Sequence, residues 1–282
     1  MLYRKQTAEQ SKLIVIMVMK MYDISSKKRV VVKVGTSTLT HKTGKVNIRR
    51  MERLVKVLSD LQNSGLEIIL VSSGAVSLGM DKMGCRTKPS DTQTKQACAA
   101  VGQCELMYLY DKLFGEYNVN VAQILMTKYI IETPRKNNVE NTFEKLIDKR
   151  IIPIVNENDT VAIDELELEF GENDTLAAQV GIYCKADLLV ILSDIDGLFD
   201  SDPHTNPDAK LIPIVTEIND HIRGLAGGAG SALGSGGMIT KITAAEIATQ
   251  SGFDMAILNG RNPNTLYDLF DGKQIGTVFI AK

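Results

Sequence analysis

The chain has 282 residues, of which 44% are hydrophobic and 23% are charged, and its formal net charge is −2. This length suffices for one large α/β domain or for two lobes around a cleft, and the balanced charge argues against a nucleic-acid-binding protein, which would carry a basic surface. The apolar runs all fall short of the roughly 18 residues that a membrane-spanning helix needs, so no membrane partner is expected either.

Residues 1–27 are predicted to be an N-terminal extension of unknown role. Leu13–Met19 is an apolar run with Lys12 before it and Lys20 after it. A secretory signal is a poor interpretation, because no small-residue cleavage site follows the run. Three interpretations stay open: an extra strand, an interaction segment, or sequence upstream of a natural start at Met21.

From residue 28 onward, short β-branched runs alternate with helical patterns. Strands are predicted at Arg29–Val34, Glu67–Ser72, Val119–Leu125, Ile151–Val155, Asp187–Leu192, Asp254–Leu258 and Thr277–Ala281. Helices are predicted at Asn47–Asn63, Gln93–Tyr117, Thr142–Lys149, Thr175–Cys184 and Met238–Gln250. This alternation predicts an α/β fold, a three-layer αβα sandwich with a mainly parallel central sheet.

Two of the predicted elements carry a distinctive pattern. The long helix places Ala97, Val101, Cys104 and Tyr108 on one face. In the segment 165–170, three apolar residues alternate with three glutamates, which predicts one arm of a half-exposed hairpin.

Small and polar residues follow four of the predicted strands. These residues are Gly35-Thr36-Ser37, Ser73-Gly74-Ala75, Asn156-Glu157-Asn158-Asp159 and Ser193-Asp194. An ordinary tight turn explains any one of them. Because the carboxyl ends of parallel strands share one sheet edge, and small residues let backbone N–H groups approach an anion, the four together predict a ligand site.

A glycine-rich stretch, Gly224–Lys241, holds seven glycines in eighteen residues and leads directly into a predicted helix. A flexible linker is one interpretation. The other is an anion site, since backbone N–H groups at a helix N-terminus and a nearby lysine both attract negative charge. The stretch has neither the spacing of a Walker A loop nor that of a dinucleotide fingerprint.

Lys33 and Asp174 are charged residues in unusual places. Lys33 lies inside an otherwise apolar strand, so its ammonium either reaches solvent or meets an anion. Asp174 begins a helix, where it can act as an N-cap, and it can also hold two lysines in their charged form.

The cysteines and histidines form no metal-ligand pattern. The four cysteines lack CxxC spacing and only three histidines are present, so no protein metal site is predicted. The cysteines are interpreted as free thiols of a cytoplasmic protein.

These motifs, in this order, resemble the amino acid kinase family over about residues 28–282, and within it the branch that phosphorylates glutamate. The single Gly35 followed by Thr-Ser differs from the double glycine of the aspartate and N-acetylglutamate branches. The matching segments are Lys33–Ser37, Ser72–Ala75, Ala100–Gln103, Pro153–Asp159, Gly171–Asp174, Ser193–Leu198, Asp202-Pro203 and Gly234–Lys241.

The resemblance implies ATP-dependent phosphorylation of the γ-carboxylate of L-glutamate, the first step of proline biosynthesis, with ATP and Mg²⁺ as cofactors. It implies catalytic roles for Lys33, Lys241 and Asp174, and glutamate binding by Ser73, Asp159 and Asn173. The residues implied in ATP binding are Lys33, Gly35, Ser193, Asp194, Ser235, Gly236, Gly237, Met238, Ile239, Thr240 and Lys241.

The family pattern also implies an organisation and a set of partners. A glutamate-binding lobe would span about residues 28–184 and an ATP-binding lobe about 185–282, without the C-terminal RNA-modifying-enzyme-type domain of many bacterial members. The implied partners are proline as feedback inhibitor, further copies of the chain in a homo-oligomer, and a downstream glutamyl phosphate reductase. Ser193 stands where the family often has threonine, which keeps the hydroxyl.

Two alternative functions share the same fold. One is a family kinase with another acceptor, such as aspartate, N-acetylglutamate or a phosphorylated small molecule. The other is an amino-acid sensor without catalytic activity. The presence of both lysines favours a kinase over a sensor.

Overall fold

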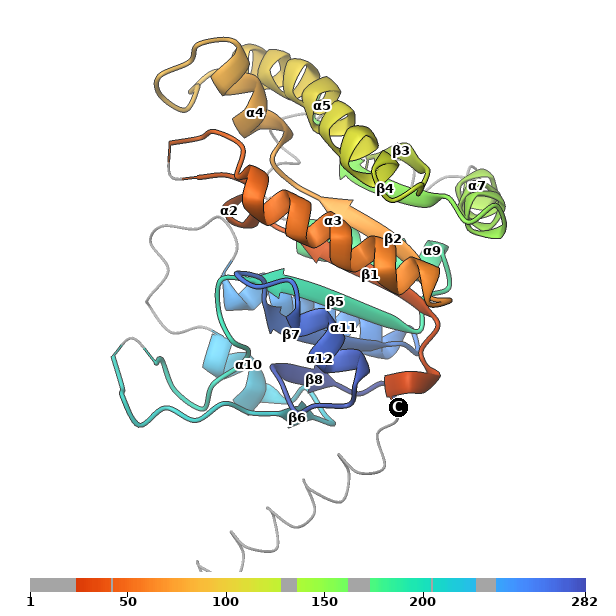
Figure 1. The fold of residues 1–282 in the computed structure, drawn as a ribbon. Coiled ribbons are helices and arrows are strands. Elements are labelled where there is room, and N and C mark those ends of the chain that lie inside the picture. The colour runs from red at the N-terminus through yellow and green to blue at the C-terminus, as the bar shows by residue number, and fades with distance from the viewer. Residues whose placement is uncertain (1–23, 42, 128–135, 162–172, 204, 227–236) are drawn as a thin grey trace, which may run out of the picture.

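The computed structural model describes residues 24–41, 43–127, 136–161, 173–203, 205–226 and 237–282. Within these residues, eight strands form one sheet in the order β3-β4-β2-β1-β5-β7-β8-β6 (Figure 1). Neighbouring strands are parallel except β7 and β8, which are antiparallel. The strands are β1 (Arg29–Val34), β2 (Glu67–Ser72), β3 (Val121–Met126), β4 (Ile152–Glu157), β5 (Leu188–Ser193), β6 (Ile214–Val215), β7 (Asp254–Asn259) and β8 (Thr277–Phe279).

Helices cover both faces of this sheet, so the predicted three-layer αβα sandwich is confirmed. Figure 1 shows α3 and α12 in front of the sheet and α9 and α11 behind it. The described helices are η1 (Ile24–Ser26), α2 (Thr36–Leu39), α3 (Ile48–Asn63), α4 (Ala75–Lys82), α5 (Thr92–Gly115), α7 (Lys136–Asp148), α9 (Asn173–Tyr183), α10 (Asp220–Ala226), α11 (Met238–Gln250) and α12 (Thr265–Phe270). None of them is long and apolar enough to cross a bilayer.

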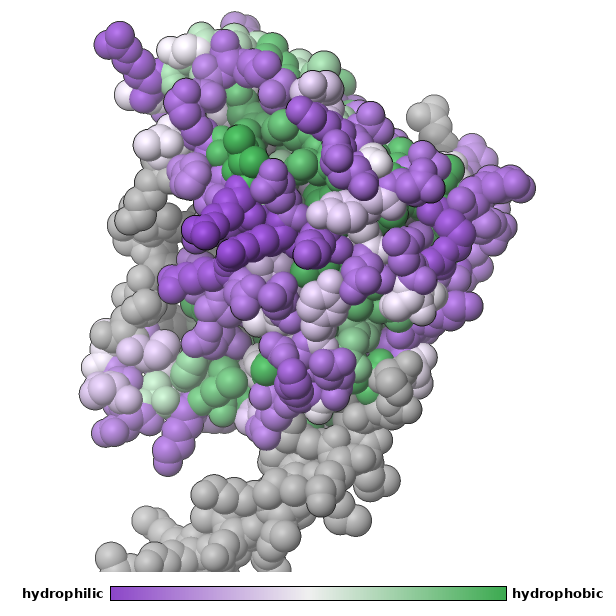
Figure 2. Space-filling model, viewed as in Figure 1, coloured by the Kyte–Doolittle hydropathy of each residue, from purple (hydrophilic) through white to green (hydrophobic). Residues whose placement is uncertain are grey.

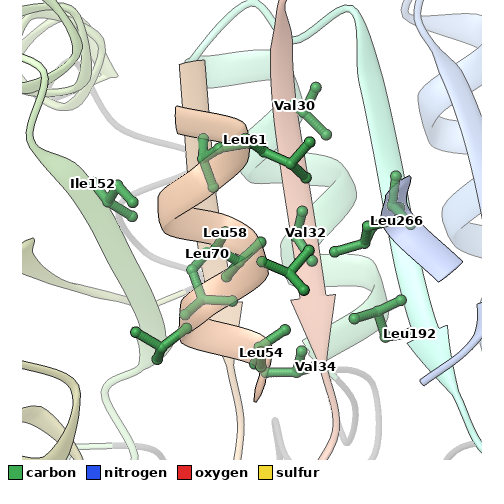
Figure 3. Close-up of a cluster of buried hydrophobic side chains, with 14 of the residues drawn as sticks. Val30, Val32, Val34, Leu54, Leu58, Leu61, Leu70, Ile152, Leu192 and Leu266 are labelled. Carbon is green, nitrogen blue, oxygen red and sulfur yellow. The ribbon is translucent and has the colours of Figure 1, made fainter. Parts of the chain in front are cut away.

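The alternation of side chains along β1 builds two separate cores. Val30, Val32 and Val34 face α3, where Leu54 and Leu58 lie one turn apart and cover them (Figure 3). Val31 belongs to the other core, with α7, α9, α10 and α11. Each fully buried valine or leucine contributes about 1.5–3 kcal/mol of transfer free energy, so both helix layers are held firmly to the sheet. By the same alternation Lys33 points toward α9 and α11.

Helix α3 shows how local sequence sets an element's ends. The side chain of Asn47, the N-cap residue, accepts a hydrogen bond from the backbone N–H of Arg50 at 3.2 Å. At the other end the chain turns at Gly65, whose φ of +116° is strained for a residue with a Cβ atom. The prediction of a helix up to Asn63 followed by a glycine stop is therefore confirmed.

Helices α4 and α5 pack closely against each other through two glycines. A Cβ atom at Gly79 of α4 would lie 1.8 Å from the carbonyl oxygen of Cys98, and one at Gly102 of α5 would lie 1.7 Å from that of Ala75. Glycine at both positions is what allows this contact. Helix α4 was absent from the sequence prediction, because Gly79 weakens an already short helical pattern.

The apolar stripe predicted on the long helix faces solvent instead of the core. Ala97, Val101, Cys104 and Tyr108 are exposed, with 41% exposure for Val101 and 59% for Tyr108. The opposite side of α5 is buried, with Leu106, Tyr110 and Phe114 packed into the core. In the view of Figure 2 the surface is mostly hydrophilic, and hydrophobic atoms are visible where α4 and α5 approach α3.

Other predictions differ from the structure or fall outside it. Helix α7 begins at Lys136 instead of Thr142, because Val139 and Phe143 both pack into the second core. The segments 13–19 and 165–170 lie outside the described residues. The prediction of free thiols is confirmed for all four cysteines, and the sulfur atoms of Cys85 and Cys98 lie 4.0 Å apart.

Arg29 anchors the amino ends of the strands, at the edge opposite the predicted site. Its guanidinium donates to Glu67 at 2.7 Å, to Glu144 at 2.8 Å and to the carbonyl oxygen of Cys184 at 2.6 Å, with 15% of the side chain exposed. Arg29→Met is expected to lower the free energy of unfolding by about 2–3 kcal/mol, because these acceptors lose their donor in a partly buried place.

Urea denaturation checks this prediction, and Lys28 provides the matched control. Its side chain is 68% exposed and its ammonium lies 3.8 Å from Glu67, so Lys28→Met is expected to change stability by less than about 0.5 kcal/mol. Equal effects of the two substitutions would contradict the anchoring role of Arg29.

Candidate active site

The carboxyl ends of five strands meet at one edge of the sheet. In the register of β1, Val34 pairs with Ser72 on one side and with Leu192 on the other, while Ser193 pairs with Asn259 on β7. Strand β4 joins the same edge through the pairing of Val71 with Val155. The four polar strand ends singled out in the sequence therefore lie along one edge, and α9 and α11 begin above it.

At this edge two lysines bind one aspartate. The ammonium of Lys33 lies 2.6 Å from Oδ1 of Asp174, and that of Lys241 lies 3.1 Å from Oδ2. Lys33 is 8% exposed, Lys241 5% and Asp174 0%, so all three are buried charged groups. Lys33 comes from β1, Asp174 from the first turn of α9 and Lys241 from the first turn of α11.

The charges of this cluster are unbalanced in favour of an anion. Burial alone would raise the pKa of Asp174, but the ammonium groups of Lys33 and Lys241 hold that pKa below its ordinary value. The carboxylate is therefore ionised at neutral pH, and the three side chains together carry one net positive charge. The N-terminal ends of α9 and α11 add positive partial charge at the same place.

Thr240 and Gly35 lie directly beside the cluster. The Thr240 hydroxyl lies 3.2 Å from Oδ2 of Asp174 and 2.9 Å from the Gly237 carbonyl oxygen. A Cβ atom at Gly35 would lie 3.8 Å from the ammonium nitrogen of Lys33, so the backbone of Gly35 lies directly beside this ammonium. An ammonium has three N–H donors, and the contact with Asp174 leaves Lys33 with donors for a phosphate oxygen.

Beside the charged cluster lies a group of neutral polar side chains. The amide nitrogen of Asn173 lies 2.9 Å from the Ser72 carbonyl oxygen, 2.8 Å from the Ser73 hydroxyl oxygen and 3.0 Å from Oδ1 of Asn156. The Ser73 hydroxyl accepts in this contact, so its own proton is directed elsewhere. Such a group can hold carboxylates by hydrogen bonds without adding charge.

The remaining predicted residues lie along the same edge. Asp159 is half-buried in the turn after β4, next to Asn158, whose N–H donates to the Met126 carbonyl oxygen at 2.8 Å. Ser193 ends β5, and its hydroxyl donates to the exposed Asp194 at 3.2 Å.

The glycine-rich stretch is described only at its end. Gly237 is the N-cap residue of α11, and Met238, Ile239 and Thr240 form its first turn with Lys241. Ile239 is 59% exposed. Ser235 and Gly236 lie outside the described residues.

Two buried polar residues of this region lie in motifs noted in the sequence, but neither was assigned a role there. Asn156 is 3% exposed and bonds to Asn173, and Gln103 is 8% exposed and bonds to Asn156. Asn156 is one of the polar residues noted after a predicted strand, and Gln103 ends the matching segment Ala100–Gln103. Their mutual hydrogen bond is a tertiary contact between a helix and a strand, which the sequence pattern did not indicate.

The comparisons agree with this geometry. The sequence profile of the amino acid kinase family matches residues 28–259. The chain therefore belongs to the amino acid kinase family.

Among its relatives are glutamate 5-kinases. One from Clostridium perfringens is 54% identical over 92% of this chain and 97% of its own length. Another, from Listeria monocytogenes, is 48% identical over 92% of this chain and 95% of its own length.

Solved structures show the same fold at low sequence identity. A carbamate kinase from Giardia lamblia bound to AMP-PNP is 16% identical, with a TM-score of 0.65, and the match covers 92% of this chain and 100% of that one. A UMP kinase from Ureaplasma parvum is 14% identical, with a TM-score of 0.63 and coverage of 90% and 99%.

Proposed function

We propose that this chain transfers the γ-phosphate of ATP to the γ-carboxylate of L-glutamate and forms L-glutamyl 5-phosphate, the first step of proline biosynthesis. The observation that carries the proposal is the pair of buried lysines held on Asp174 at the sheet edge, beside a cluster of neutral hydrogen-bonding groups. The 54% identity to a glutamate 5-kinase supports glutamate as the acceptor. ATP and glutamate are both cytoplasmic metabolites, which fits a cytoplasmic enzyme.

The reaction needs charge neutralisation more than proton transfer. A glutamate side chain has an ordinary pKa of about 4.3, so the acceptor is already a nucleophilic carboxylate at neutral pH. Its oxygen attacks the γ-phosphorus in line, the bond from that phosphorus to the bridging oxygen breaks, and ADP leaves. Lys33 and Lys241 would offset the repulsion between the two anions, while Asp174 keeps both ammonium groups oriented.

Mg²⁺ fits this site as a companion of ATP. Magnesium in phosphotransferases usually binds phosphate oxygens, water and at most one or two carboxylates. Both oxygens of Asp174 already face lysines, and the described residues hold no cluster of three or more ligating side chains. When bound with ATP, the ion would supply further neutralisation of phosphate charge.

The substrates would occupy opposite sides of Lys33. In the proposed lobe of residues 28–184, the Ser73 hydroxyl would donate to a glutamate carboxylate, while Asn173 and Asp159 would bind the ammonium group of glutamate through their side-chain oxygens. In the lobe of residues 185–282, ATP would bind at the carboxyl end of β5 and at the start of α11. Gly35 and Lys33 would lie between the ATP site and the glutamate site. The pairing of β1 with β5 joins these lobes in one sheet.

An acceptor panel tests the proposal. Purified protein is expected to release ADP from MgATP with L-glutamate, and hydroxylamine should trap the product as γ-glutamyl hydroxamate. Aspartate and N-acetylglutamate are expected to support little release. Turnover with one of these acceptors only, or glutamate binding without any ADP release, would contradict the proposal.

The same assay extends to the proposed partners. Added proline is expected to inhibit as an end product, and the labile acyl phosphate calls for a reductase that consumes it. Sedimentation would determine whether the chain forms the proposed homo-oligomer.

A further inference from the structure

Three side-chain amides form a chain that leads from α5 to the proposed amino-acid site. Oε1 of Gln103 accepts a hydrogen bond from Nδ2 of Asn156 at 2.8 Å. Oδ1 of Asn156 accepts from the backbone N–H of Glu157 at 2.9 Å and from Nδ2 of Asn173 at 3.0 Å. Asn173 in turn donates to the Ser73 hydroxyl.

The direction of this chain is fixed by backbone groups at two points. The N–H of Glu157 can only donate, so the side-chain oxygen of Asn156 must face it. The carbonyl of Ser72 can only accept, so the NH₂ of Asn173 must face that carbonyl. The NH₂ of Asn156 is thereby left to point at Gln103, which must present its oxygen.

The backbone around Gln103 is also held in place. Its neighbour Gly102 lies so close to the first turn of α4 that a Cβ atom there would be 1.7 Å from the Ala75 carbonyl oxygen. Gln103 itself is 8% exposed, and its NH₂ group has no hydrogen-bond partner among the described residues. A buried donor without a partner is costly, so the residue is poorly explained by stability alone.

We propose that Gln103 is a positioning residue for the amino-acid site and acts through Asn156. Without its oxygen, the NH₂ of Asn156 is a buried donor with no acceptor, so the side chain is expected to shift toward another acceptor or toward water. Because Oδ1 of Asn156 accepts from Asn173, a shifted Asn156 would move Asn173 with it and weaken the contact between Asn173 and the Ser73 hydroxyl. This inference rests on the proposed function, in which Ser73 and Asn173 bind glutamate.

Kinetics of Gln103→Met, which keeps the side-chain length but no hydrogen bond, test the inference. The KM for glutamate is expected to rise at least about tenfold, because loss of one charge-assisted hydrogen bond to the substrate typically weakens binding by at least this factor. The KM for ATP is expected to stay within about twofold. Gln93→Met is the matched control, because Gln93 lies exposed on the same helix, and it is expected to change neither KM.

A double-mutant cycle separates positioning from general support of the fold. In the background of Asn156→Ala, Gln103→Met is expected to change the KM for glutamate by less than about twofold, because the residue through which it acts is gone. The same tenfold change in both backgrounds would overturn the inference, as would an unchanged KM in the single variant. If Gln103→Met does not fold, Gln103→Asn, which is too short to reach Asn156, provides the same comparison.

The outcomes distinguish this inference from the proposed function. Wild-type protein that turns over glutamate, together with an unaffected Gln103→Met, refutes only the role of Gln103. Wild-type protein that uses another acceptor instead refutes the proposed function, and the KM for that acceptor then tests Gln103 in the same variants.

Discussion

Lys241→Met and Lys33→Met are each expected to lower kcat by at least about 10²–10³-fold, the usual cost of removing one preorganised donor from a site of charge transfer. Methionine keeps much of the volume of lysine, so the substitution removes mainly the ammonium group. The reason for the expected loss is electrostatic. Two anions must approach within bonding distance, and each ammonium is buried beside the carboxylate that orients it.

Initial rates of ADP release at saturating ATP and glutamate measure this effect. Lys56→Met is the control, because Lys56 is exposed on α3, on the other face of the sheet. Thermal unfolding of each variant shows whether the fold survives the loss of one ion pair. Near-normal turnover of either folded variant would remove that lysine from the proposed mechanism.

The double variant Lys33→Met, Lys241→Met tests whether the two lysines act on the same step. If both lysines act on the same transferring group, their effects should not add, and the double variant should be little slower than the worse single variant. Full additivity would indicate that the two ammonium groups act on different steps, such as binding and transfer.

Much of the fold could be predicted from the sequence because its strands are buried on both faces. β1 and β2 are short, mostly apolar runs followed by turn residues, and their predicted bounds coincide with the observed ones. Helix α4 could not be predicted in this way. It is stabilised by the close approach of Gly79 to the backbone of Cys98, a tertiary contact that opposes the low helix propensity of glycine.

The long helix α5 shows a different limit of periodicity. Val101 and Tyr108 belong to an apolar stripe that is exposed, while the buried side includes Gly102, Gln103 and Tyr110. Small and polar residues face the interior here because α4 and the amide of Asn156 lie against them. Hydrophobic spacing therefore identified the helix but did not identify its packed face.

The charged part of the site was predictable for a physical reason that the amide chain lacks. A lysine inside an apolar strand must either reach solvent or meet an anion, and an aspartate at the start of a helix is a suitable partner. The structure brings Lys33 and Asp174 together at 2.6 Å. Neutral amides make no such demand, so the contacts of Asn156 and Gln103 emerge only from the folded arrangement.

Asp174→Asn is expected to be the most destabilising single change in the site. It removes the charge that compensates two buried ammonium groups and leaves an amide NH₂ facing one of them. Breaking a buried ion pair by removal of one partner typically costs about 3–5 kcal/mol, so urea denaturation at pH 7 should show a loss of that size. Asp111→Asn, at an exposed position of α5, is the control and should change stability by less than about 0.5 kcal/mol.

The pH dependence of this difference has a definite sign. Because the pKa of Asp174 is lowered in the folded state, its stabilising effect is complete above the unfolded pKa of about 3.9 and is lost as the pH falls through the lower folded value. The stability difference between wild type and variant is therefore expected to be complete at neutral pH and to shrink as the pH falls below about 3.9. A difference that does not change over this acidic range would show that Asp174 acts through packing instead of charge.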